Sequence, residues 1–265
     1  MFKIFNKLNF EYKRGGFRHV LLGSVEKTLI TILELFPNMY WLIAPRYYYW
    51  RSSNDIYQYQ CPPDPFKIEY VSPSKIHNKS GRSDDHMNRR LLFGKIMGGE
   101  WDKSEINFEE SLIYKAAEDR FINNVSWEET EKIQQSFNKV DDWKSQGSKY
   151  KTRKEVLERY DRFDNLYEKI KTEGYLSQKK ILSNTKQIND GLFLDTLDEV
   201  TVDVGRDGEL LLVDGSHRLA IAKLLDLDEI PVVFLVRHKE WMEYRDKLCQ
   251  SNDPIPDHPD LRDLK

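Results

Sequence analysis

Five consecutive residues, Asp214 to Arg218, combine the side chains and the backbone freedom that an anion site needs. The run Asp-Gly-Ser-His-Arg follows a β-rich stretch and precedes a mostly apolar stretch that is typical of a helix. Gly215 lets an anion approach the backbone, and a helix N-terminus offers unpaired N–H groups and a partial positive charge. Arg218 in the first helical turn opposes that dipole unless an anion lies there. The pattern predicts a phosphate site.

The chemistry open to this site depends on Asp214, at the end of the strand. Its carboxylate could position Mg²⁺ or accept a proton from an attacking hydroxyl. A purely structural alternative also fits, because Asp-Gly is an ordinary turn and Ser216 an ordinary N-cap, which leaves His217 and Arg218 as surface residues. Short motifs often match by chance, so the five residues alone favour the structural alternative and their context must decide.

The surrounding elements form a strand, turn, helix and strand. Two β-rich runs, Val200 to Val204 and Glu209 to Val213, flank the turn-forming Gly205-Arg206-Asp207-Gly208 and predict a hairpin. A helix is expected from His217 to Leu225, followed by a strand from Ile230 to Val236. This order places Gly215 at a strand-to-helix junction.

With that context, Val213 to Ala220 followed by Leu227 to Val233 resembles the core of the ParB/sulfiredoxin superfamily. The preceding helix, ending Tyr167 to Tyr175, resembles the helix before that core. The resemblance covers roughly residues 153 to 240, with Phe66 to Ile76 as a first strand. Over nearly its whole length the chain also resembles uncharacterised microbial and archaeal proteins that carry this core, which supplies no function.

Three branches of the superfamily differ at the matched positions. Sulfiredoxins carry a catalytic cysteine where this chain has Ser216, so reduction of sulfinic acids is not expected. ParB proteins carry an acidic residue and two arginines after the glycine, where this chain has Ser216, His217 and Arg218, and no helix-turn-helix follows. The motif of the free-serine-kinase-like branch, Asp-Gly-His-His-Arg, agrees at four of five positions.

The resemblance to the kinase-like branch implies a nucleotide-dependent phosphotransferase acting on a small hydroxylated molecule. Asp214 would assist the acceptor hydroxyl, while Gly215, Ser216, His217 and Arg218 would hold the phosphates of ATP, ADP or CTP, with Mg²⁺. Glu69 is a candidate for the second acidic residue of that branch. If the phosphate site is real, Arg218→Ala should weaken nucleotide binding without unfolding the free protein. If the residues only cap a helix, the same change should leave stability unchanged or raise it slightly.

Two other classes of function stay open. The departures from each enzymatic branch also suit a non-catalytic nucleotide-dependent switch or adaptor. A ParB-like nucleic-acid-binding protein or nuclease fits less well, because 41 basic and 44 acidic residues give a net charge of -3 and no general attraction for a phosphate backbone.

Residues 1 to 60 form a separate segment by composition, with eight Lys/Arg against four Asp/Glu and many aromatics. A helical segment that packs its aromatics inward is the ordinary interpretation. The alternatives are contact with a partner protein, with an anionic membrane surface or with single-stranded nucleic acid. The proline-rich run Cys61 to Pro65 marks the predicted domain boundary.

Residues 61 to 265 are then expected to form one ParB/sulfiredoxin-like domain in an α+β protein. It would contain a helical insertion at about 78 to 150 and a C-terminal tail at 247 to 265. The polar stretch Asn78 to Asp85 is predicted to be a mobile loop, and Phe66 to Val71 a half-buried strand.

Capping signals predict two helix starts, at Ser126 and at Thr152, the second helix ending before Gly174. The expected core hydrophobics are Leu211, Val213, Leu219, Leu224, Val233 and Leu235.

Two cysteines, Cys61 and Cys249, are too few for a disulfide framework and are not spaced as a metal-binding pair. No metal site is assigned beyond the Mg²⁺ of a nucleotide. No stretch reaches the ~20 apolar residues of a spanning helix. A cytoplasmic location, peripheral to the membrane at most, is therefore expected.

Overall fold

The described residues form a mixed α+β structure built around one mixed sheet, which confirms the α+β class expected from the sequence. The computed structural model describes residues 37–82, 92–141, 152–184 and 195–265, with Leu21, Ser24, Val25, Thr28 and Phe193. Residues 37–41, 53, 54, 184 and 195 are described by their backbone only. Within the described residues, no helix has the length and apolar character needed to cross a membrane.

The sheet has the order β1-β5-β3-β4, and the short β2 also pairs with β5. Its strands are β1 (Ile68–Val71), β2 (Lys95–Met97), β3 (Val200–Val204), β4 (Leu210–Asp214) and β5 (Ile230–His238). β5 runs parallel to β3 and β2 and antiparallel to β1. All nine residues of β5 are buried, as expected of an apolar strand with neighbours on both sides.

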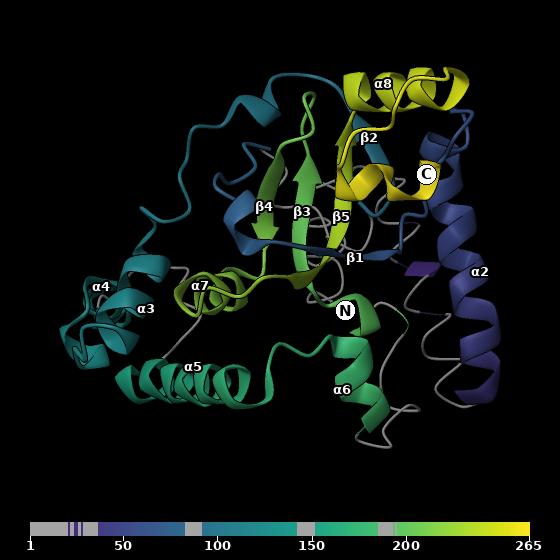
Figure 1. Ribbon diagram of the computed structural model, residues 1–265. Coiled ribbons are helices and arrows are strands. Elements are labelled where there is room, and N and C mark those ends of the chain that lie inside the picture. The colour runs from purple at the N-terminus through teal and green to yellow at the C-terminus, as the bar shows by residue number, and fades with distance from the viewer. Residues whose placement is uncertain are drawn as a thin grey trace.

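β3 and β4 form the predicted antiparallel hairpin. The turn is closed by the N–H of Gly205, which donates to the carbonyl of Glu209 at 2.9 Å. Figure 1 shows β4, β3 and β5 side by side, with α7 (Ser216–Leu224) crossing near the lower end of β4. The hairpin therefore delivers the chain directly to the start of α7.

Helices cover both faces of the sheet. α7 packs on one face together with α3 (Leu112–Phe121), α4 (Glu131–Asp141) and α5 (Arg153–Glu173). α2 (Pro37–Ile56) contributes Ala44 and Tyr48 to a second cluster on the opposite face, with Leu211 and Val233. Of the expected core residues, Leu211, Leu219, Val233 and Leu235 are buried, whereas Val213 and Leu224 are only partly buried.

The remaining helical elements of the described residues are two α-helices and five 3-10 helices. They are α6 (Gln178–Asn184), α8 (Lys239–Gln250) and the 3-10 helices Pro73–Lys75, Trp101–Lys103, Trp127–Glu129, Asp195–Leu197 and Pro259–Leu264. Of the basic N-terminal segment, residues 1 to 60, the structure describes α2, residues 57–60 and the four positions Leu21, Ser24, Val25 and Thr28. The aromatic residues of α2 differ in burial: Tyr48 is buried, whereas Trp50 is 65% exposed.

The two predicted helix starts have different outcomes. Thr152 caps α5 by accepting from the N–H of Glu155 at 3.1 Å, and Gly174, with φ of 78°, ends the helix as expected. Ser126 forms its predicted capping box with Glu129, but only one 3-10 turn follows. Thr130 then adopts an extended conformation, so α4 begins separately at Glu131.

The prediction of a mobile loop from Asn78 to Asp85 is wrong for its described part, and residues 83–85 lie outside the described residues. The N–H of Ser80 donates to the carbonyl of Leu212 at 2.9 Å, and the N–H of Leu212 donates to the carbonyl of Asn78 at 2.8 Å. This segment lies along β4, held by backbone hydrogen bonds that a polar sequence does not reveal. The expected helical insertion also contains β2.

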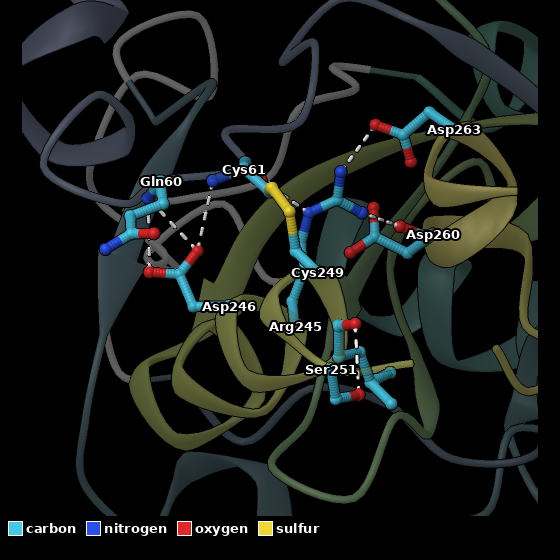
Figure 2. Close-up of a disulfide and its surroundings, with 9 residues drawn as sticks. Gln60, Cys61, Arg245, Asp246, Cys249, Ser251, Asp260 and Asp263 are labelled. Carbon is cyan, nitrogen blue, oxygen red and sulfur yellow. Dashed lines mark hydrogen bonds and ion pairs between the residues drawn. A yellow bond between two sulfur atoms is a disulfide. The ribbon is translucent and has the colours of Figure 1, made fainter. Parts of the chain in front are cut away.

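The two cysteines form a disulfide, although their number had not suggested one. Cys61, after α2, is bonded to Cys249 on α8, with the two Cα atoms 6.4 Å apart (Figure 2). Asp246 accepts hydrogen bonds from the backbone N–H groups of Gln60 and Cys61, both at 3.1 Å. The predicted domain boundary is thereby fastened to the C-terminal part of the chain.

Arg245 extends this connection into the C-terminal tail. Its Nε donates to the carbonyl of Cys61 at 2.8 Å, and its other nitrogens bond the carbonyl of Asp260 and the carboxylate of Asp263 (Figure 2). Asp260 is buried and also pairs with Arg237 of β5 at 2.6 Å. The tail is therefore part of the packed structure.

Candidate phosphate site

All five residues from Asp214 to Arg218 line one cleft of about 560 Å³ at the start of α7. Gly215, between β4 and α7, has φ of 90°, and a Cβ added there would lie 2.9 Å from the Cα of Val200. Only glycine fits this junction without strain. The first turn of α7 thus presents its N–H groups to a cleft whose other wall is α5.

Asp214 is exposed at the end of β4, and its Oδ1 accepts a hydrogen bond from the N–H of Gly215 at 2.7 Å. The carboxylate is therefore folded back toward its own turn while remaining at the mouth of the cleft. In this position it can accept a proton from a hydroxyl group, or it can contribute one oxygen to a cation.

His217 is wedged between the cleft and α5. Its ring stands edge-to-face against Phe163, with centroids 4.6 Å apart, and its Nε2 is buried without a hydrogen-bond partner. Burial, followed by the charges of Arg159 and Lys132, lowers the pKa of His217 to about 4. The imidazole is neutral near pH 7, so it can offer a hydrogen bond to a ligand but no charge.

Arg218 is less free than the sequence suggested. Its Nη1 donates to the carbonyl of Asp198, and its guanidinium lies 3.6 Å from the carboxylate of Asp198 and 3.8 Å from that of Glu199. Removing the Arg218 side chain would take away the positive charge that lies beside the buried carboxyl of Glu199. The expectation that Arg218→Ala leaves the free protein undisturbed therefore loses its basis.

Glu199, next to the cleft, is one of the residues that sequence reasoning missed. It is fully buried beside Arg218, with Oε1 accepting from the N–H of Gln178 at 2.5 Å and Oε2 without a hydrogen-bond partner. Burial raises its pKa to about 7. Carboxylates with such shifted pKa values are typical of functional sites. The only sequence signal was an acid directly before an apolar strand.

Glu69, the candidate second acid, lies elsewhere. It is buried on β1 and pairs with Lys67 and, at 3.3 Å, with Arg262. β5 and β3 stand between β1 and β4, so three strand spacings, about 14 Å, separate its strand from that of Asp214. The structure does not bring Glu69 to the cleft.

Four cations near the start of α7 have no carboxylate partner among the described residues. Arg159 and Arg162 of α5 line the cleft, and Lys79 and Lys132 line an adjoining hollow of about 800 Å³. Ser216 and His217 belong to both cavities. The sequence did not reveal these cations, because a polar helix face looks the same whether it meets solvent or a ligand.

Comparisons of the chain with models of known families, with curated proteins and with solved structures found no match. The described residues contain no group of three or more His, Cys, Asp and Glu side chains suited to a metal ion. Asp198 and Asp214 both line the cleft and could supply two oxygen ligands. This donor set suits Mg²⁺ only where a ligand's phosphates complete the coordination.

Proposed function

We propose that the cleft at the start of α7 binds the phosphates of a nucleotide, ATP, ADP or CTP, together with Mg²⁺. The observation that carries this proposal is the pair Arg159 and Arg162, which have no carboxylate partner among the described residues and face the first turn of α7 across the cleft. Arginine and free helical N–H groups are the donors that phosphate oxygens prefer.

The order of elements supports a ParB/sulfiredoxin-like core as the framework of this site. A hairpin, a glycine turn, a helix and a buried strand follow one another in the order on which the resemblance rests. The resemblance to the kinase-like branch then suggests the reaction, transfer of a phosphoryl group to a small hydroxylated molecule.

The chemistry of this transfer asks little of the protein beyond positioning and charge neutralisation. The acceptor oxygen would form a bond to the terminal phosphorus as the bond from phosphorus to the nucleotide oxygen breaks. Asp214 would take the hydroxyl proton, while Arg159, Arg162 and the first turn of α7 hold the phosphate oxygens. Mg²⁺ would offset the charge that develops on those oxygens.

A non-catalytic switch is the second candidate, and the hydrogen bond from the N–H of Gly215 to Asp214 favours it. An aspartate whose role is to brace its own turn needs no part in a reaction. In a switch, bound phosphate would compete with Asp198 and Glu199 for Arg218 and so change the contacts between α7 and the start of β3.

Calorimetric titration with ATP, ADP and CTP in the presence of Mg²⁺ tests the site. We expect Arg159→Gln/Arg162→Gln to weaken nucleotide binding by about ten- to a hundredfold, because each loses a charge-assisted hydrogen bond. Lys169→Gln, on the same helix but outside the cleft, serves as the control and should bind normally. Equal binding by wild type and the double variant, or none by wild type, would refute the proposal.

Turnover separates the two candidates. For an enzyme, Asp214→Asn abolishes nucleotide consumption with a panel of hydroxylated metabolites but leaves nucleotide affinity within about threefold. For a switch, wild type binds nucleotide and consumes none. Binding of DNA that weakens steeply with salt would instead favour the nucleic-acid class.

A further inference from the structure

The hollow that adjoins the cleft at Ser216 and His217 is formed by different elements. The segment after β1 supplies Lys79, α4 supplies Lys132, and the start of α3 supplies Ser111 to Ile113. Ser216 and His217 form the wall that it shares with the cleft. A molecule in this hollow would therefore meet the first turn of α7 without contacting Arg159 and Arg162, which line only the cleft.

The backbone that carries Lys79 is held firmly. Its N–H donates to the carbonyl of Ile106 at 2.9 Å, and the same segment bridges to Leu212 of β4. Its Nζ lies 5.8 Å from the centroid of Phe108, whose ring is fully buried. The position of the ammonium group is thus restricted by the backbone bonding of Lys79 and by the ring of Phe108.

Lys132 faces the same hollow from α4, and both lysines are only partly exposed. Burial lowers the pKa of each, and the charge of Lys132 lowers that of Lys79 further. The glutamates that line the hollow, Glu105 and Glu110, are exposed and form no ion pair with either lysine among the described residues. An anion bound between these two half-buried ammonium groups would offset their mutual repulsion and stabilise their charged forms.

We propose that this hollow holds the acceptor of the phosphoryl transfer, a small hydroxylated molecule that also carries a carboxylate or phosphate group, with Lys79 and Lys132 binding that oxyanion. The hydroxyl would then lie at Ser216 and His217, where the two cavities meet. The proposal rests on the proposed function for the reaction, but the oxyanion site stands on its own geometry.

Titration calorimetry of the full chain with D-glycerate and with inorganic phosphate, separately, tests the hollow. At least one probe should bind to wild type, and Lys79→Gln/Lys132→Gln should weaken that binding by at least about tenfold. The double variant should bind nucleotide within about twofold of wild type. Lys115→Gln, on an exposed position of α3, is the control for loss of a lysine outside the hollow, and it should bind both probes as wild type does.

The outcomes separate this site from the nucleotide cleft. Binding of a probe that Arg159→Gln/Arg162→Gln leaves intact and the lysine variant loses supports the hollow, even if no nucleotide binds and the phosphotransferase fails. The proposal is overturned if the arginine variant loses probe binding and the lysine variant keeps it. It is also overturned if wild type binds neither probe. Because the lysine variant removes repelling charges, its melting temperature should not fall, which excludes unfolding as the cause.

Discussion

At the scale of single residues, burial favours the uncharged form of two ionisable groups, His217 in the cleft and Glu199 behind Arg218. His217 loses its proton more readily than a free imidazole, with a pKa of about 4, and Glu199 holds its proton more tightly, with a pKa of about 7. Both shifts arise mainly from desolvation, so they have opposite signs in an acid and a base. Arg159, Arg162 and Arg218 then supply the positive charge of the site.

Glu199 should make the protein less stable as pH rises. The unfolded chain releases the proton of this carboxyl near pH 4.5, whereas the folded protein keeps it to about 7, so the free energy of unfolding falls between these values. The loss attributable to Glu199 should be on the order of 3 kcal/mol at most. Glu199→Gln removes this titration and keeps an oxygen for the N–H of Gln178.

Chemical denaturation of wild type and Glu199→Gln at about pH 5 and about pH 8 measures this effect. The low pKa of His217 produces the opposite slope, but it does so in both proteins, so the difference between them isolates Glu199. Parallel pH profiles would show that the carboxyl is ionised in the folded protein.

At the scale of elements, the sequence predicted what short-range signals determine. α5 is bounded by the capping of Thr152 and by Gly174, and the β3–β4 hairpin by its own turn, so neighbours a few residues away suffice. Five contiguous residues of the cleft were found for the same reason. Glu199, Lys79 and the pairing of residues 78–80 with β4 depend on partners far along the chain, and no local pattern indicates them.

The ion pair between Arg82 and Asp203 fastens the segment after β1 to the sheet. The two side chains are 4% and 0% exposed, with Nε and Oδ2 2.5 Å apart, and Asp203 also accepts from Ser80 and from the N–H of Val236. Burial raises the pKa of Asp203 to about 6 despite Arg82. This arrangement tolerates no missing partner.

Asp203→Asn should therefore lower the free energy of unfolding by about 3 to 5 kcal/mol, because it leaves Arg82 charged and buried. Adding Arg82→Met should recover part of that loss. Glu158→Gln, which breaks the exposed pair with Lys154, is the control and should cost at most about 0.5 kcal/mol. Urea denaturation measures these free energies of unfolding. Similar losses for Asp203→Asn and Glu158→Gln would contradict the prediction.

At the scale of the whole molecule, the Cys61–Cys249 disulfide joins parts of the chain 188 residues apart. Closing so large a loop restricts the unfolded chain strongly, so Cys249→Ser should lower the free energy of unfolding by about 2 to 4 kcal/mol under oxidising conditions. Excess dithiothreitol should lower the free energy of unfolding of wild type to that of Cys249→Ser. A wild type as easily denatured as Cys249→Ser without reductant would show that the bond contributes nothing.

The sheet order has a consequence for how the chain is made. β5 is hydrogen-bonded to β1, β2 and β3, yet it is the last of these strands to leave the ribosome. Until residues 230–238 emerge, neither β1 nor β2 has a partner among the described strands, and of the described strand pairs only the β3–β4 hairpin can form. The nascent chain therefore carries unpaired strand edges for most of its synthesis, which is the condition under which chains associate wrongly or recruit chaperones.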